Sequence, residues 1–106
     1  MKVLIVDDEE LTREGIRMSI PWENLGITEV YMAEDGEEGL KKALELLPDI
    51  ILADVRMPRM DGITMAFEIR KSWKQCRFIF VSGYCDKEYL KSAIQLSAVN
   101  YIEKPV

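Results

Sequence analysis

The feature that most constrains the fold is the alternation of short, mostly apolar runs with longer amphipathic stretches along the chain. A short apolar run is typical of a buried strand, and a longer stretch with apolar residues at helical spacing is typical of a surface helix. Strands and helices that alternate in this way indicate a parallel sheet covered by helices. The expected strands are residues 3–6, 29–32, 50–53, 78–81 and 99–102, and the expected helices are residues 11–20, 36–47, 63–73 and 87–96.

Capping and stop signals support this division. Asp35 is placed to cap the helix expected over residues 36–47, and Pro48 is placed to stop it. Pro21 ends the preceding helix, and residues 21–26 form a connection into the second strand. The chain of 106 residues is therefore predicted to form one α/β domain around one core.

The charge composition excludes several classes of function. The chain has 14 Lys and Arg residues against 19 Asp and Glu, a net charge of -5, and no histidine. Because it lacks a basic stripe, this segment is not expected to bind nucleic acid by itself. The absence of histidine excludes Ser-His-Asp catalysis, Cys-His catalysis and most zinc sites. Carboxylate, hydroxyl and lysine side chains remain as the candidates for the chemistry of a functional site.

Hydropathy and cysteine placement predict a cytoplasmic protein with no membrane contact. No apolar stretch approaches the roughly 20 residues that span a bilayer. Cys76 and Cys85 lie on either side of the expected strand 78–81, which would hold them too far apart for a disulfide. Two free thiols suit a reducing compartment.

Polar side chains follow the expected strands at the points where the strands end. The carboxyl ends of parallel strands meet at one edge of a sheet, and ligands bind there near the point where the strand order reverses. We therefore expect carboxylates, a hydroxyl and an ammonium to share one pocket, although they lie up to about 100 residues apart in sequence. These groups belong to Asp7, Asp8, Asp54, Ser82 and Lys104.

Such a pocket predicts a magnesium ion and a phosphoryl group. Neighbouring carboxylates repel one another unless a cation lies among them, and an all-oxygen site favours Mg2+ over zinc or copper. A bound Mg2+ would cancel the charge that keeps a phosphoryl group away, while Ser82 and Lys104 supply a donor and a cation for its oxygens. One carboxylate can then act as the nucleophile and form an acyl phosphate.

The chain resembles the receiver domains of two-component response regulators through four motifs in this order at strand ends. These are Asp7-Asp8, DVRMPRMDG at residues 54–62, Ser82-Gly83 and Lys104-Pro105. The resemblance covers residues 1–106 as one receiver domain. PWENLG at residues 21–26, the DVRMPRMDG stretch and the C-terminal residues are most similar to regulators with an AraC-type helix-turn-helix DNA-binding domain.

The resemblance implies roles in a metal site. Asp54 would accept a phosphoryl group from a sensor histidine kinase, Asp8 would bind Mg2+ directly, and Asp7 would bind it through water. Arg56 would lend its backbone carbonyl to the metal, so its side chain is free to vary. The domain would catalyse only its own phosphorylation and dephosphorylation and would not be an enzyme for outside substrates.

The resemblance also implies a switch and a lifetime for the phosphorylated state. Ser82 and Lys104 would contact the phosphoryl oxygens, and Tyr101 would occupy the aromatic switch position. Arg56 and Tyr84 lie two positions after the acceptor and two after the hydroxyl residue. Both are large, and neither side chain can orient an attacking water, so slow loss of the phosphoryl group is expected.

The fold that the resemblance implies is a flavodoxin-like (CheY-like) doubly wound parallel sheet of five strands in the order 2-1-3-4-5. Right-handed crossovers place the first helix on one face and the next three on the other. Receivers of this pattern continue into a fifth helix, so the chain is expected to be truncated before it. It is then expected either to self-associate through the bare sheet surface or to exchange an element with a neighbouring copy, as in a homodimer. The helix-turn-helix output domain is expected in the parent protein and not in residues 1–106.

Several of these residues also have plainer interpretations. Asp7 and Asp8 could cap the helix 11–20, and Tyr101 could be an ordinary half-buried strand aromatic. Asp61, before a glycine, is expected to be only a turn residue.

Other functions are compatible with the fold but not with the loops. A dehalogenase-like phosphatase needs a second acid two residues after its nucleophile, where this chain has Arg56. A flavin mononucleotide site needs a first loop that receives a phosphate, which the acidic residues 7–10 would repel. The alternative that stays open is a degenerate receiver that acts only as a protein-interaction module.

Overall fold

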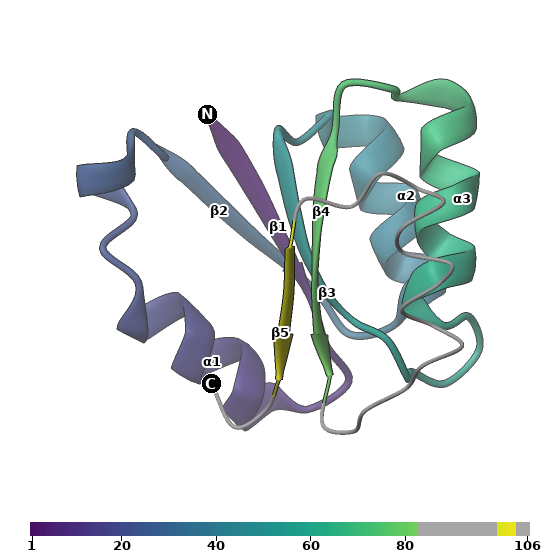
Figure 1. Cartoon of the computed structure of the whole chain (residues 1–106), viewed down its shortest axis with the longest axis horizontal. Coiled ribbons are helices and arrows are strands. Elements are labelled where there is room, and N and C mark those ends of the chain that lie inside the picture. Colours follow the sequence, from purple (N-terminus) through teal and green to yellow (C-terminus); the bar gives the residue numbers. More distant parts are fainter. Residues whose placement is uncertain (83–99, 104–106) are drawn as a thin grey trace.

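Five parallel strands form one sheet in the order β2-β1-β3-β4-β5 (Figure 1). The computed structural model describes residues 1–82 and 100–103, with the backbone alone at Ser82 and in β5. The predicted class and strand order are confirmed, while the helix expected over residues 87–96 lies outside the described part. The strands are β1 (Lys2–Val6), β2 (Glu29–Ala33), β3 (Ile50–Asp54), β4 (Arg77–Ser82) and β5 (Asn100–Glu103).

Three helices of the described region match the predicted ones, namely α1 (Glu10–Ser19), α2 (Gly36–Leu46) and α3 (Gly62–Ser72). As predicted, Asp35 caps α2, because its carboxylate accepts a hydrogen bond of 2.8 Å from the Glu38 N–H. Asp61 does more than form a turn, since its carboxylate accepts a hydrogen bond of 2.7 Å from the Thr64 N–H and caps α3.

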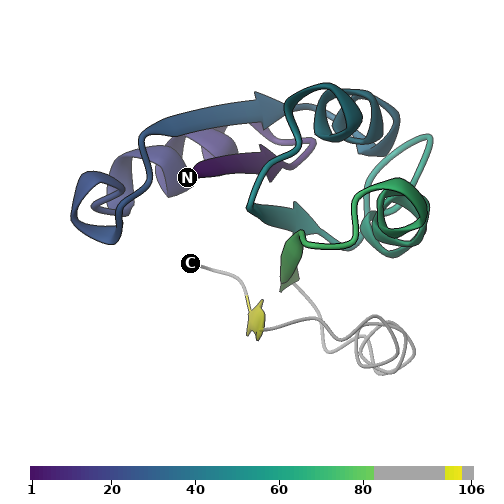
Figure 2. The same ribbon diagram turned by 90° about the horizontal axis from the view of Figure 1, so that it is seen from above.

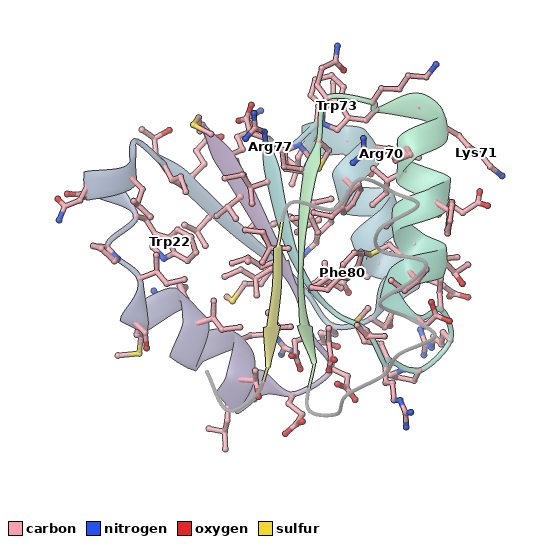
Figure 3. The ribbon with its side chains drawn as sticks, viewed as in Figure 1. Trp22, Arg70, Lys71, Trp73, Arg77 and Phe80 are labelled. Atoms are coloured by element: carbon pink, nitrogen blue, oxygen red, sulfur yellow. The ribbon has the colours of Figure 1, made fainter. Side chains whose placement is uncertain are left out.

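The connection between α1 and β2 contains a short 3-10 helix, η1 (Glu23–Leu25), that the sequence did not predict. One turn of this kind has no apolar periodicity to reveal it. It ends at Gly26, whose φ of 78° lies in the left-handed region. Trp22 packs against the α1 side of the sheet and donates its indole N–H to the Arg17 carbonyl at 2.8 Å, which ties the end of α1 to this turn (Figure 3).

Alternate residues of the strands serve two separate cores. Leu4, Val6, Ile51 and Ala53 face the core formed with α2 and α3, and Val3, Ile5 and Leu52 face the smaller core formed with α1. Figure 1 shows α1 on one side of the sheet and α2 and α3 on the other, and the view from above shows α2 beside α3 (Figure 2). For these three helices, the predicted distribution over the two faces is confirmed.

Cys76, directly before β4, is a buried free thiol. Burial raises its pKa to about 12, which leaves it protonated and unreactive at neutral pH. Cys85 lies outside the described residues. Among residues 1–82 and 100–103, no helix is both long enough and apolar enough to cross a membrane.

Candidate functional site

The strand register brings three of the predicted site residues to one edge of the sheet. Val6, the last residue of β1, pairs with Ala33 on one side and with Ala53 on the other. Asp7 directly follows Val6, and Asp54 directly follows Ala53. The two aspartates therefore lie at the same height at the ends of neighbouring strands. Asp54 pairs with Val81, and Ser82 pairs with Glu103 of β5. The backbone thus places Asp7, Asp54 and Ser82 along the carboxyl edge of β1, β3 and β4.

The loop after β1 gathers three carboxylates. Asp7 is buried, with 1% of its surface exposed, whereas Asp8 and Glu9 are exposed. The Asp7 carboxylate accepts a hydrogen bond of 2.9 Å from the Glu9 N–H, which folds the loop back on itself. One carboxylate oxygen from each of these three residues lies within 4.8 Å of the others. This oxygen-only donor set suits a hard divalent cation.

Glu9 is a member of this cluster that the sequence analysis did not assign to the site. The only signal for it was its place in the acidic run of residues 7–10. Capping, the plainer interpretation of Asp7 and Asp8, accounts for little of the geometry. The N-cap of α1 is Glu9, and its side chain makes no capping hydrogen bond. The Asp7 carboxylate does stabilise the turn that leads into the helix.

Asp54 ends β3 and has 7% of its surface exposed. The chain returns to it at the start of α3, where the Gly62 N–H donates a 2.8 Å hydrogen bond to the Val55 carbonyl. A Cβ at position 62 would overlap the carbonyl oxygen of Asp54, so this position requires glycine. Arg56, between them in sequence, has an exposed side chain.

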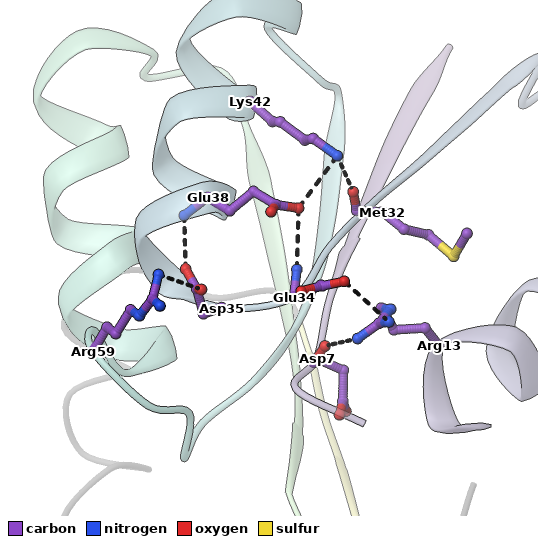
Figure 4. A network of polar contacts seen from close by, with 8 residues as sticks. All are labelled: Asp7, Arg13, Met32, Glu34, Asp35, Glu38, Lys42 and Arg59. Carbon is purple, nitrogen blue, oxygen red and sulfur yellow. Dashed lines mark hydrogen bonds and ion pairs between the residues drawn. The ribbon is translucent and has the colours of Figure 1, made fainter. Parts of the chain in front are cut away.

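The loop that follows Asp54 is also held by the first turn of α2. Arg59 has a φ of 70°, an unusual conformation for a residue with a side chain. Its guanidinium lies 3.5 Å from the carboxylate of Asp35, the residue that caps α2 (Figure 4). A Cβ at Gly36 would overlap the carbonyl oxygen of Met60. In both Asp-Gly pairs of the chain, the aspartate therefore caps a helix. The glycine, which is the first residue of that helix, packs against the backbone of the segment from Asp54 to Met60.

Arg13 is a further residue at this edge that the sequence analysis missed. It lies in α1 and has 9% of its surface exposed, and its guanidinium bonds to the backbone of Asp7. A possible signal was its position three residues before Ile16 on the buried face of an amphipathic helix, where an apolar residue is usual.

Other predicted positions are only partly described. Ser82 and Tyr101 are placed by their backbone in β4 and β5. Tyr84 and Lys104 lie outside the described residues. The structure therefore brings together the Asp7, Asp8 and Asp54 segments and the backbone of Ser82.

Comparison with known proteins identifies the family. The family model for the response regulator receiver domain matches residues 3–106. The chain belongs to this family. The transcriptional regulatory protein HptR of Staphylococcus aureus is 38% identical over 105 residues, a match that covers 99% of this chain and 41% of HptR. The chain thus spans about two fifths of the length of this curated relative.

Solved receiver domains show the same fold. A two-component transcriptional regulator AraC from Clostridium phytofermentans is 48% identical with a TM-score of 0.92, covering 100% of this chain and 82% of that one. The receiver domain of AraT from Geobacillus stearothermophilus is 43% identical with a TM-score of 0.92, covering 99% of this chain and 81% of that one. These matches confirm the predicted similarity to receivers of AraC-type regulators.

Proposed function

We propose that this receiver domain accepts a phosphoryl group on Asp54 in a Mg2+-dependent reaction and changes conformation to control an output domain. The observation that carries the proposal is the position of Asp54, buried at the carboxyl end of β3 between the strands that lead to Asp7 and Ser82. A carboxylate oxygen of Asp54 forms a bond to phosphorus while the bond between phosphorus and the donor breaks, and the bonding electrons leave with the donor.

The acidic loop after β1, the strand that pairs with the Asp54 strand, offers oxygen ligands that fit a magnesium ion. Asp8 would bind it directly, Asp7 through water, Asp54 through its carboxylate and Arg56 through its backbone carbonyl. The oxygen-only cluster of Asp7, Asp8 and Glu9 supports this assignment, because oxygen is the donor that Mg2+ prefers. When bound, the ion offsets negative charge that would otherwise repel the incoming phosphoryl group.

The remaining roles belong to residues that lie in β4 and β5 or follow β3, β4 and β5. Ser82 and Lys104 would bind the phosphoryl oxygens, and Tyr101 would report the modification by turning its ring inward. Arg56 and Tyr84 would shield the acyl phosphate from water and prolong its lifetime. The domain would change only its own phosphorylation state and would process no outside substrate.

For the parent protein, we propose a sensor histidine kinase as the phosphoryl donor and a helix-turn-helix domain as the output, in the cytoplasm. The support for the output is the name of HptR as a transcriptional regulatory protein and the AraC name of the Clostridium phytofermentans regulator. The net charge of -5 argues that this segment does not itself bind DNA.

Intact mass after incubation with Mg2+ and a small phosphodonor tests the proposal. We expect the wild-type chain to gain the mass of one phosphoryl group, and we expect Asp54→Asn to gain none. Asp61→Asn is the matched control, because it changes a carboxylate of the same loop that caps α3, and it should still be modified. A degenerate receiver that serves only as an interaction module would gain no mass in any variant.

A further inference from the structure

Arg13 is a buried cation whose guanidinium points at the acidic loop. It comes from the fourth position of α1 and has 9% of its surface exposed. One terminal nitrogen donates a buried hydrogen bond of 2.7 Å to the backbone carbonyl of Asp7, and the other lies 3.9 Å from a carboxylate oxygen of Glu34 (Figure 4). The side chain therefore bridges the acidic loop after β1 and the end of β2.

This arrangement differs from that of an ordinary surface ion pair. Arg17, one turn further along α1, lies 2.7 Å from Glu14 on the exposed side of the same helix. Arg13 instead makes its short bond to a neutral carbonyl, and its carboxylate partner Glu34 has a side chain that is 71% exposed. A guanidinium cannot escape the cost of burial by losing its proton. The burial of Arg13 therefore depends on its hydrogen bond to the acidic loop.

The bond to the Asp7 carbonyl fixes the orientation of the next residue. The carbonyl of Asp7 and the N–H of Asp8 belong to one rigid peptide plane. Asp7 is also held by its N–H, which donates to the Ala33 carbonyl at 3.2 Å, and by its carboxylate, which accepts from the Glu9 N–H at 2.9 Å. With the carbonyl fixed as well, the positions of the Asp8 N and Cα atoms are fixed, and the bond from the Glu9 N–H restrains Asp8 from its other side.

We propose that Arg13 is a positioning residue for the divalent cation, acting through the Asp7-Asp8 peptide. This inference rests on the proposed function of the acidic loop as part of a Mg2+ site. Two other roles predict different results. A guanidinium that acted only through its charge would repel the ion, so its removal would tighten binding. A guanidinium that only joined α1 to the sheet would change stability but not the affinity of the folded protein.

Calorimetric titration with Mg2+ separates these three roles by the sign of the change. We expect Arg13→Met to weaken Mg2+ binding about tenfold, the usual scale for removing a group that orients a metal ligand. Arg13→Lys should bind Mg2+ with an affinity between those of the wild type and Arg13→Met. An ammonium keeps the charge but lacks the planar fork that reaches both Asp7 and Glu34. Arg17→Met removes the same charge from the exposed side of α1 and should bind like the wild type.

The rate of phosphorylation by a small phosphodonor gives an independent readout. For Arg13→Met and Arg13→Lys, the Mg2+ concentration that gives half the maximal rate should rise in step with the dissociation constant. The rate at saturating Mg2+ should stay close to that of the wild type. This separation of affinity from maximal rate would not follow from a general loss of structure.

Unchanged or tighter Mg2+ binding in both Arg13 variants would overturn the proposal. If Arg13→Met does not fold, Arg13→Lys decides alone, and wild-type affinity in that variant overturns the proposal equally. A wild-type chain that binds no Mg2+ and gains no phosphoryl mass would instead refute the proposed function. A wild-type chain that does both, with Arg13 variants of equal affinity, would refute the role of Arg13 only.

Discussion

The two ends of the sheet use charged residues in opposite ways. At the amino end, Asp49 accepts a 2.7 Å hydrogen bond from the Lys2 N–H, and its own N–H donates to the Lys2 carbonyl at 2.9 Å. Trp73 donates its indole N–H to the Pro48 carbonyl at 2.7 Å at this end (Figure 3). At the carboxyl end, the chain instead collects carboxylates of like charge in the loop after β1.

This difference separates a structural end from a functional one. At the amino end, the polar groups of Lys2, Pro48, Asp49 and Trp73 satisfy one another, as expected where stability alone is selected. At the carboxyl end, like charges lie together in the loop after β1, which is unfavourable without a cation. Left-handed backbone does not distinguish the two ends, because Leu47 near the amino end has a φ of 50° and Arg59 near the carboxyl end has a φ of 70°. A cluster of like charges persists where the surrounding fold holds it in place for a purpose.

The largest expected effect is that of an added methyl group at the carboxyl end. In Gly62→Ala, the new Cβ would overlap the Asp54 carbonyl, so the backbone must shift and we expect a loss of at least about 2 kcal/mol in the free energy of unfolding. Gly15→Ala is the matched control. Beyond the adjoining backbone of α1, no atom lies within 4 Å of the added Cβ, so this change should stabilise the protein by about 0.5–1 kcal/mol. Urea titration measures both, and a neutral Gly62→Ala would contradict the proposed close approach.

A smaller loss is expected from removing the acid at the amino end. Asp49→Ala leaves the partly buried Lys2 N–H without its acceptor, which should reduce the free energy of unfolding by about 1 kcal/mol. Asp49→Asn keeps a side-chain oxygen in place and should lose less. If both substitutions have the same effect in denaturant unfolding, the hydrogen bond is not what stabilises this end.

The arrangement of the strands and the edge where the site forms could be predicted because their signals are local. Buried parallel strands appear as continuous apolar runs, and the residue after each run must lie at the carboxyl edge. One helix cap followed from the same kind of pattern. For Asp35, a carboxylate directly before an amphipathic stretch was enough, and the structure has the predicted bond.

The contacts that hold the site could not be predicted, because they join segments that are distant in sequence. That Gly36 touches Met60 and that Gly62 touches Asp54 depends on how the loops pack, and an Asp-Gly pair alone indicates only a turn. Arg13 is similar, since a lone arginine in an amphipathic helix gives no sign that it reaches a backbone carbonyl. Glu9 enters the acidic cluster because its N–H bonds to the Asp7 carboxylate.

The most direct test of the contrast between the two ends is the shift in unfolding midpoint that Mg2+ causes. If the carboxyl end needs a cation to offset its carboxylates, Mg2+ should raise the midpoint of the wild-type protein. Asp8→Ala should melt above the wild type without metal and gain little from Mg2+, whereas Asp49→Ala should melt below it and gain the full shift. Equal Mg2+ shifts in the wild-type protein and in Asp8→Ala would contradict this account.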